Sequence, residues 1–419
     1  MASFRPYVTI FKYLANKGYR VSFISTPRNI KRLPKIPTNL APLLNFVELT
    51  LPNDDHNLPA EAEATSDILL DKAGYLKKAF DGLESPLAHF LEILSYPADW
   101  IIYDFAPHWL PPIAAKLGIP CVYFSIFNAT CLSYLAAPSL RELDEDASKN
   151  PYEGLSIRPK WIPFEFDNNF VLRMYEIKKL MKFDQANVSG VEDRFRGASI
   201  MQGCEVVAVR SCPEIETEWL SLLQDEIHKK TVIPIGLLPP PHVNLQEDDE
   251  MWAPIKEWLD KKETKNVIYV ALGSEVILSQ EETTELALGL ESSELPFFWV
   301  LRAPVGSTEY ELPTGFEDRV KGRGFICKSW APQLKILSHP SVGAFLTHCG
   351  WSSVIESLGI GCPIVLLPFI NDQGIMARML QLKNIAFEIP RNNMDGSFTR
   401  ESVAKSLRKL VIEKVILSR

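Results

Sequence analysis

The sequence predicts an α/β protein built on two doubly wound parallel sheets. Short runs of β-branched and aromatic residues recur, and each is followed by a segment of helical length, which is the rhythm of βαβ units. The runs form two series, separated by a proline-rich and acidic stretch at 236–250. With 419 residues, of which 46% are hydrophobic, the chain is long enough to bury two cores.

The first series belongs to an expected N-terminal domain at 1–235. Its expected strands are, in order, YRVSFIS at 19–25, FVELTL at 46–51, DWIIYDF at 99–105, CVYFSI at 121–126, EVVAVRS at 205–211 and TVIPIG at 231–236. Residues 127–200 are aromatic and irregular. Most of them suit helices packed on the sheet, and such a lining would also suit a flat lipophilic ligand.

The second series belongs to an expected C-terminal domain at 252–419. Its expected strands are NVIYVALGS at 266–274, FFWVLRA at 297–303, GFICKSW at 324–330, VGAFLTH at 342–348, PIVLLPF at 363–369 and IAFEI at 385–389, with helical patterns such as SQEETTELALGLESS between them. We expect a linker at 236–251, because three consecutive prolines and a run of acids suit neither a helix interior nor a central strand.

Charge and composition exclude several classes of function. There are 44 Lys and Arg against 52 Asp and Glu, so the net charge of -8 offers no basic surface for nucleic acid or anionic lipid. No apolar run is long enough for a membrane span, and the first residues lack the features of a signal peptide. The seven cysteines show no C-x-x-C spacing. We therefore expect a cytoplasmic monomer with reduced thiols, no stable membrane insertion and no zinc site.

The turn after the expected strand 342–348 has the composition of an anion site. A helix that follows a parallel strand offers free backbone N–H groups and a positive dipole end. Gly350 allows close approach of the backbone, Ser352 and Ser353 add hydroxyl donors, and His348 adds a ring N–H. Together these groups suit a diphosphate.

The residues of this turn can also be explained by a purely structural role. Ser353 and Glu356 form an S-x-x-E capping box, which is common at the start of any helix. His348 and Trp351 each also suit a core position. The residues of the turn alone leave the two explanations open.

A longer match favours the functional interpretation. From Trp330 to Gln373 the chain reads WAPQLKILSHPSVGAFLTHCGWSSVIESLGIGCPIVLLPFINDQ, which closely resembles the signature of plant family 1 UDP-dependent glycosyltransferases. Similar stretches occur at 19–30, 97–120 and 266–276. Within the family, the chain most resembles the branch that adds a sugar to a flavonoid or terpenoid glycoside.

The resemblance implies a fold and a set of donor contacts. The fold is the GT-B type, in which two Rossmann-like domains face each other across a cleft. Trp330 would lie against the uracil ring, a stacking contact worth ~1–3 kcal/mol. Gln333 would read the base edge, and Glu356 would accept hydrogen bonds from the ribose hydroxyls.

The remaining donor contacts are also implied by the resemblance. His348, Ser353 and Ser274 would donate hydrogen bonds to the phosphates, with Gly350 at the turn. Facing the sugar would be Trp351, Asp372 and Gln373. Ser352 stands where much of the family has Asn, so its contact to phosphate would be shorter or lost.

Catalysis in the family uses a His held by an Asp. The Asp position corresponds to Asp104, at the end of the expected strand 99–105, where a helix cap is the alternative. The His position falls on Ser3, which cannot act as a base at neutral pH. Among the other histidines, His108 lies four residues beyond Asp104. Its position favours a structural role over a catalytic one.

Both ends appear short relative to the family, so we expect a truncated member that lacks the first strand and part of the C-terminal helices. Asp144-Glu145-Asp146 has the form of a metal-binding Asp-x-Asp, but it lies in a charge run typical of a solvated loop. We therefore expect no metal and no cofactor, with the UDP-sugar as co-substrate.

The sequence thus predicts inverting, metal-independent transfer of a hexose from UDP-glucose or UDP-rhamnose to a small lipophilic acceptor or glycoside. One alternative is a protein that binds UDP-sugar without turnover, because the catalytic His is missing. Another is an NAD-dependent oxidoreductase, which the missing strand-linked G-x-G-x-x-G disfavours.

Overall fold

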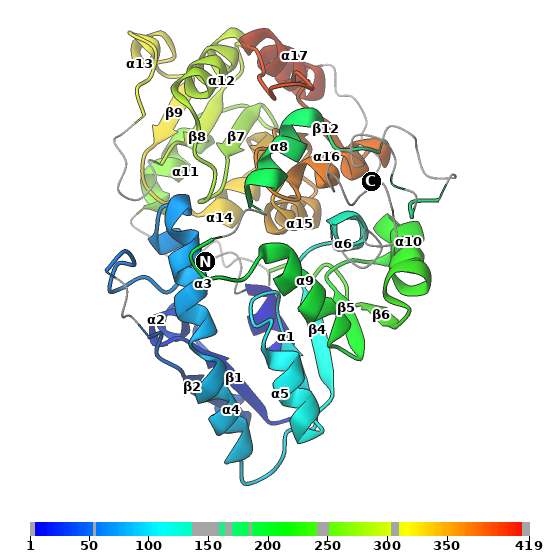
Figure 1. Cartoon of the computed structure of the whole chain (residues 1–419). Coiled ribbons are helices and arrows are strands. Elements are labelled where there is room, and N and C mark those ends of the chain that lie inside the picture. Colours follow the sequence, from blue (N-terminus) through cyan, green and yellow to red (C-terminus); the bar gives the residue numbers. More distant parts are fainter. Residues whose placement is uncertain are drawn as a thin grey trace. The chain divides into compact units, whose positions relative to one another are not determined.

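The chain forms two compact units, which the computed structural model describes at residues 5–52, 56–135, 159, 161–163, 170–183, 187–240, 251–302 and 310–412 (Figure 1). The first unit takes in Met1–Ser148 and Phe183–Pro240, and the second takes in Lys149–Lys182 and Pro241–Arg419. The segment 149–182, which we expected in the first domain, thus belongs to the second unit. The division at Pro240 falls inside the expected linker, of which 241–250 lies outside the described residues.

The first unit contains parallel strands in two sheets. A two-stranded sheet pairs β1 with β2, and a four-stranded sheet has the order β3-β4-β5-β6. The strands are β1 (Val21–Ser25), β2 (Leu44–Glu48), β3 (Ile101–Tyr103), β4 (Cys121–Ser125), β5 (Val206–Val209) and β6 (Thr231–Pro234). In parallel strands the carboxyl ends lie at one edge, so the residues that follow β3, β4 and β5 share that edge.

Helix α1 (Arg5–Asn16) packs against both sheets of the first unit. It buries a stripe at helical spacing formed by Val8, Phe11 and Ala15. The Phe11 ring lies 5.2 Å from Phe23 of β1, and the Tyr7 ring lies 4.9 Å from Phe124 of β4, measured between ring centroids. The other helices are α2 (Pro27–Lys31), α3 (Ala73–Asp81), α4 (Glu84–Glu92), α5 (Leu110–Leu117), α6 (Ala129–Leu135), α9 (Asp193–Gln202) and α10 (Pro213–Leu222), with short 3-10 turns at Ala41–Leu43, Thr65–Asp67 and Leu70–Lys72 and a π-helical turn at Leu223–His228.

The second unit is built on one six-stranded parallel sheet with the order β12-β11-β10-β7-β8-β9. The chain starts in the middle at β7, moves outward to β9, and returns to continue from β10, so the order reverses between β7 and β10. This is the topological switch point where doubly wound sheets bind ligands. The strands are β7 (Val267–Ala271), β8 (Phe297–Val300), β9 (Gly324–Cys327), β10 (Val342–Thr347), β11 (Ile364–Leu366) and β12 (Ala386–Glu388).

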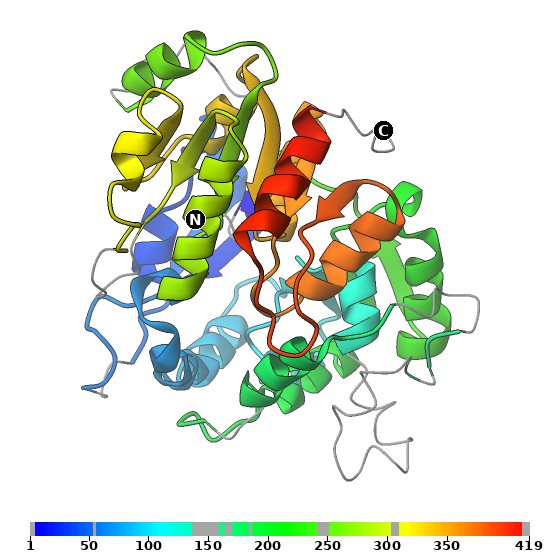
Figure 2. The ribbon, with the colours of Figure 1, turned by 90° about the horizontal axis from the view of Figure 1, so that it is seen from above.

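Helices cover the sheet of the second unit. Figures 1 and 2 show α12 and α17 side by side, and their close packing requires Gly289, where a Cβ atom would lie 2.6 Å from Cβ of Val403. The helices are α8 (Met174–Phe183), α11 (Trp252–Asp260), α12 (Gln280–Ser292), α13 (Phe316–Arg319), α14 (Gln333–Leu337), α15 (Trp351–Ile360), α16 (Gln373–Leu382) and α17 (Arg400–Val411). The predicted fold class, α/β with doubly wound parallel sheets, is confirmed.

Two further observations concern the described residues. All seven cysteines lie in the described ranges and none of them forms a disulfide; six are buried. A search of the helices in the described ranges finds none that combines the length and the apolar character needed to cross a bilayer.

Candidate functional site

Three loops of the second unit meet at the carboxyl edge of its sheet. Ser274 lies in the exposed loop after β7, His348 follows β10, and Asp372 lies in the loop after β11. The charges of Glu275 and Asp372 interact, and so do Asp372 and the Cys349 thiol, which places the three loops close together. The switch point between β7 and β10 thus carries polar residues contributed by separate segments.

His348 lies between two glycines of these loops. A Cβ atom on Gly273 would lie 2.7 Å from the Nε2 atom of His348, and one on Gly350 would lie 2.5 Å from it, so neither position can hold a larger residue without displacing the ring. Burial lowers the pKa of His348 to about 4. The imidazole is therefore neutral at physiological pH and acts as a hydrogen-bonding group.

The start of α15 presents the first backbone N–H groups of a helix. Gly350 is the N-cap in an extended conformation, and its carbonyl accepts the Val354 N–H at 3.0 Å. Cys349 has a φ of 68°, a left-handed conformation that is unusual for a residue with a side chain. No side chain caps the helix, so the capping box suggested by Ser353 and Glu356 is not formed.

Instead, Glu356 pairs with Gln333 of α14. The Gln333 Nε2 atom donates to Oε2 of Glu356 at 2.7 Å and lies 3.4 Å from the Ser353 hydroxyl, while the Tyr269 hydroxyl lies 3.4 Å from Gln333 Oε1. Glu356 is only 6% exposed. These contacts link α14 to α15 across the end of the sheet.

Trp330, three residues before Gln333, is 51% exposed. A Trp ring this accessible is available for stacking against a planar ligand and is not part of the core. Trp351, by contrast, is 5% exposed and packs in the interior.

The Asp372–Gln373 pair has two different roles in the loop. The Gln373 Oε1 atom accepts the backbone N–H groups of Phe369 and Ile370 at 2.9 and 3.0 Å, so this atom holds the loop in place. Burial, together with the charge of Glu275, raises the pKa of Asp372 to about 6. Asn371 has a φ of 53°, another left-handed conformation of a residue other than glycine.

No group of three or more His, Cys, Asp or Glu side chains that could hold a metal ion occurs within the described ranges. Asp144-Glu145-Asp146 lies outside those ranges. The polar groups at the switch point are backbone N–H groups, hydroxyls, a neutral imidazole and carboxylates, which can bind a phosphate ester and hydroxyl groups by hydrogen bonding.

In the first unit, Asp104 follows β3 at the carboxyl edge. Its Oδ1 atom accepts the Ala106 N–H at 2.9 Å, which closes a local turn. The next helix, α5, begins at Leu110 with Trp109 as its N-cap, so Asp104 does not cap it. Burial raises the pKa of Asp104. Ser3, the residue at the position of the catalytic His, lies outside the described residues.

Tyr7 is a neighbour of Asp104 that was not expected from the sequence. Burial raises the pKa of Tyr7 well above its usual value, and the Asp104 charge raises it further, which places the phenol beside this carboxylate. Tyr7 lies in the first turn of α1, and the local sequence pattern does not place that turn beside β3.

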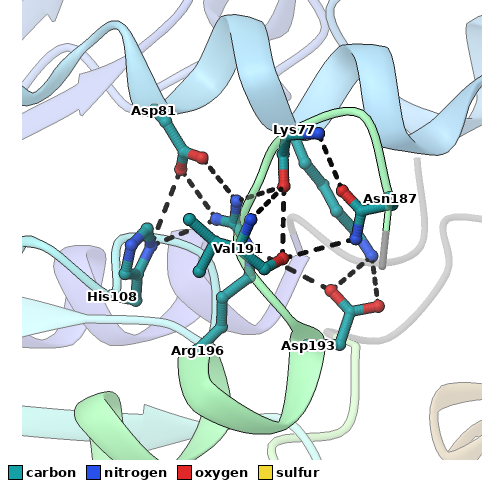
Figure 3. Close-up of polar contacts among 8 residues, drawn as sticks. Lys77, Asp81, His108, Asn187, Val191, Asp193 and Arg196 are labelled. Carbon is teal, nitrogen blue, oxygen red and sulfur yellow. Dashed lines mark hydrogen bonds and ion pairs between the residues drawn. The ribbon is translucent and has the colours of Figure 1, made fainter. Parts of the chain in front are cut away.

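His108 belongs to a separate cluster in the first unit (Figure 3). Its Nδ1 atom lies 3.1 Å from Nη1 of Arg196 and 3.6 Å from Oδ1 of Asp81, while Lys77 of α3 pairs with Asp193 of α9 at 2.5 Å. Burial and the Arg196 charge lower the pKa of His108. The ring thus takes part in a network that ties α3 to α9.

Comparisons with known proteins show the family of the chain. Residues 242–416 match the family described as UDP-glucoronosyl and UDP-glucosyl transferase. UDP-glycosyltransferase 91C1 of Arabidopsis thaliana is 46% identical over 99% of this chain and 87% of its own length. Soyasaponin III rhamnosyltransferase of Glycine max is 39% identical over 99% of this chain and 86% of its own length.

Solved structures show the same architecture. The structure of Phytolacca americana UGT2 complexed with UDP-2-fluoro-glucose and pterostilbene has a TM-score of 0.73 and 25% sequence identity, over 98% of this chain and 87% of that chain.

The doubly wound units and the phosphate-compatible switch point thus define an enzyme of the nucleotide-sugar glycosyltransferase class, which transfers a sugar from a UDP-sugar. The chain belongs to the family 1 UDP-dependent glycosyltransferases of plants.

Proposed function

We propose that this glycosyltransferase transfers a hexose from UDP-glucose or UDP-rhamnose to a hydroxyl of a flavonoid or terpenoid glycoside, with inversion and without a metal ion. The observation that carries the proposal is the convergence of the loops after β7, β10 and β11 at the N-terminus of α15. The relative from Glycine max is named a rhamnosyltransferase of a saponin, which supports rhamnose as a donor and a terpenoid glycoside as an acceptor.

The nucleoside binds at α14 and the base of α15. Trp330 stacks on the uracil through its exposed ring. Gln333 reads the base edge, and Glu356 accepts hydrogen bonds from the ribose hydroxyls. The 2.7 Å contact between Gln333 and Glu356 orders both side chains before the nucleotide binds, which reduces the entropy lost on binding.

The diphosphate binds at the N-terminus of α15. The backbone N–H groups in the first turn of α15, the hydroxyls of Ser353 and Ser274 and the neutral His348 imidazole donate hydrogen bonds to its oxygens. These donors also stabilise the charge that develops on the UDP leaving group, as preorganised dipoles do in other transferases. The Ser352 side chain is shorter than the Asn that much of the family has at this position, so its contact to the phosphate is shorter or lost.

The sugar lies against the loop after β11. Trp351 faces it only through the small part of its side chain, 5%, that is exposed. Asp372 accepts hydrogen bonds from sugar hydroxyls. Gln373 donates through Nε2, because its Oε1 atom already accepts two backbone N–H groups.

Transfer requires removal of a proton from the acceptor hydroxyl. The acceptor binds at the first unit, where the Asp104 carboxylate receives this proton as the acceptor oxygen bonds to the anomeric carbon. The bond from that carbon to the UDP oxygen breaks on the opposite side, and UDP leaves with the electron pair. The raised pKa of Asp104 makes its carboxylate a stronger base than an ordinary aspartate.

A second candidate function is UDP-sugar binding without transfer. The observation that favours it is Ser3 at the position of the catalytic His. Both candidates share the donor site and differ in turnover.

One experiment separates the two candidates. The purified chain is incubated with UDP-glucose or UDP-rhamnose and a panel of flavonoid and terpenoid glycosides, in the presence and absence of a chelator. We expect a glycoside with an inverted anomeric centre, formed equally in both conditions, and a loss of about 100-fold or more in kcat for Asp104→Asn, as for removal of a general base. Binding of UDP without any product supports the second candidate.

The proposal includes a cytoplasmic monomer that needs no cofactor besides its UDP-sugar co-substrate. Its small-molecule partners are the donor and the acceptor. Sedimentation of the purified chain, with and without UDP, tests the oligomeric state.

A further inference from the structure

A helix from the middle of the sequence packs on the sheet and helices of the second unit. Residues 170–183 lie between α6 and α9 in the sequence, and both of these helices belong to the first unit. Helix α8 nevertheless packs with α16 and β12 of the second unit. In Figure 1 it is the green helix beside the orange α16. This placement was not expected from the sequence.

A buried carboxylate of α8 pairs with an arginine in the second turn of α16. Glu176 accepts two hydrogen bonds from Arg378, from Nη1 at 3.0 Å and from Nη2 at 2.8 Å, and a third from the Arg173 N–H at 2.7 Å. Burial alone would raise the pKa of Glu176, but the Arg378 guanidinium outweighs it and the pKa is lowered. Glu176 is therefore a carboxylate with a fixed position.

This carboxylate lies directly against Gly374. A Cβ atom at Gly374 would lie 2.0 Å from Oε1 of Glu176, a distance that no alanine could tolerate without moving the carboxylate. Gly374 follows Gln373 at the start of α16. The position of Glu176 thus determines where the beginning of this helix, and with it the end of the preceding loop, can lie.

Lys179 holds the other end of the same loop. Its ammonium group donates to the Phe369 carbonyl at 2.7 Å, while Gln373 Oε1 accepts the Phe369 and Ile370 N–H groups. Asn371 between them adopts the left-handed conformation. A strained residue in a loop persists when contacts on both sides determine the backbone.

Two more contacts attach the segment to the same region. Arg173 pairs with Glu388 of β12 through both guanidinium nitrogens, one of them at 2.9 Å. The Arg391 guanidinium lies 5.2 Å from the Tyr175 ring centroid and 4.9 Å from that of Phe369.

We propose that Glu176 and Lys179 are positioning residues of the donor site, which hold the Phe369–Gln373 loop so that Asp372 and Gln373 meet the sugar of the donor. The inference rests on the proposed function, which assigns the sugar to this loop. A buried ion pair is weak evidence for stability, since desolvation offsets its attraction, and its value here lies in the fixed geometry. The mid-chain segment is then part of the sugar-recognition apparatus.

The proposal predicts a selective loss of affinity. UDP lacks the hexose that is transferred, so its binding depends on α14 and α15 and not on the loop after β11. Glu176→Gln and Lys179→Met should weaken binding of UDP-2-fluoro-glucose by about tenfold, the factor that corresponds to one lost hydrogen bond. Binding of UDP should change less than about twofold.

Isothermal titration of UDP and of UDP-2-fluoro-glucose into each purified variant measures both affinities. Glu257→Gln is the matched control, because Glu257 forms an exposed ion pair with Lys261 at 2.7 Å on α11. Gly374→Ala provides a second route to the same effect, since its methyl group displaces the Glu176 carboxylate. Thermal unfolding of each variant shows whether it is folded at the titration temperature.

Equal weakening of both ligands, or of neither, in folded Lys179→Met and Gly374→Ala would overturn the proposal. Glu176→Gln removes a buried charge and has the greatest risk of misfolding. If this variant is not folded, Lys179→Met and Gly374→Ala still decide the test. Absence of UDP binding in the unaltered chain would instead overturn the proposed function, so the two failures are distinguishable.

Discussion

The amide of Gln333 donates to the carboxylate of Glu356 at 2.7 Å, which joins the first residue of α14 to the second turn of α15. The two residues are separated by β10 in the sequence, and both lie at its carboxyl end. The contact shows that the proposed base-reading and ribose-reading residues are one coupled unit.

Replacing either member of this pair should weaken UDP binding non-additively. Glu356→Ala removes an acceptor for the ribose and leaves Gln333 without its partner, so we expect a loss of about 1.5–3 kcal/mol, or about 10–150-fold in Kd. In a double-mutant cycle with Gln333→Ala, the second substitution should cost less than it does alone by about 0.5 kcal/mol or more. Additive costs in calorimetric titrations would show that the two side chains act independently.

Trp330 should contribute to binding through its ring face. Trp330→Ala should weaken UDP binding by about 1–3 kcal/mol, while Trp330→Phe should retain much of the affinity. Because the ring is 51% exposed, neither substitution should lower the melting temperature appreciably. A large fall in melting temperature with unchanged UDP affinity would indicate that the ring has a structural role.

His348 should remain neutral over the working range of the enzyme. Its pKa is lowered to about 4 by burial, so the affinity for UDP-glucose, whose phosphates keep a fixed charge, should not rise as pH falls from about 8 to about 5.5. His348→Gln keeps a neutral donor and should retain part of the affinity that His348→Ala loses. Titrations at several pH values would contradict this if tighter binding appeared below about pH 6.5 in the unaltered chain only.

Asp372 should make the stability of the fold depend on pH. Its pKa is raised to about 6 by burial, so between its unfolded value near 3.8 and about 6 the folded chain binds the proton more tightly than the unfolded chain. The free energy of unfolding should therefore fall as pH rises through this window. Above the window, the contribution of Asp372 to this free energy should stay constant. Asp372→Asn should raise the melting temperature more at about pH 7 than at about pH 4.5; an equal change at both would contradict the shift.

Much of the donor site could be predicted from the sequence because its residues lie close together in one stretch. The strand that ends at His348, the turn at Gly350 and the helix that follows are local features, and their anion-binding character follows from backbone geometry. The functional pairing of Glu356 could not be read from its spacing to Ser353, because a capping box and a ligand site share the same pattern.

The contacts of α8 could not be predicted for a different reason. Glu176 and Arg378 are far apart in the sequence, and nothing in the local pattern indicates that a helix between elements of the first unit packs on the second. The same holds for Tyr7 in the first turn of α1 and Asp104 after β3, which lie side by side. Such pairs depend on tertiary packing and not on periodicity.

The most direct measurement is a calorimetric titration of the unaltered chain with UDP, compared with Glu356→Ala. The account predicts binding at one site per chain that weakens by about tenfold or more in the variant. Absence of any binding heat at several temperatures, or equal affinity in the two proteins, would contradict the claim that α14 and α15 form the nucleotide site.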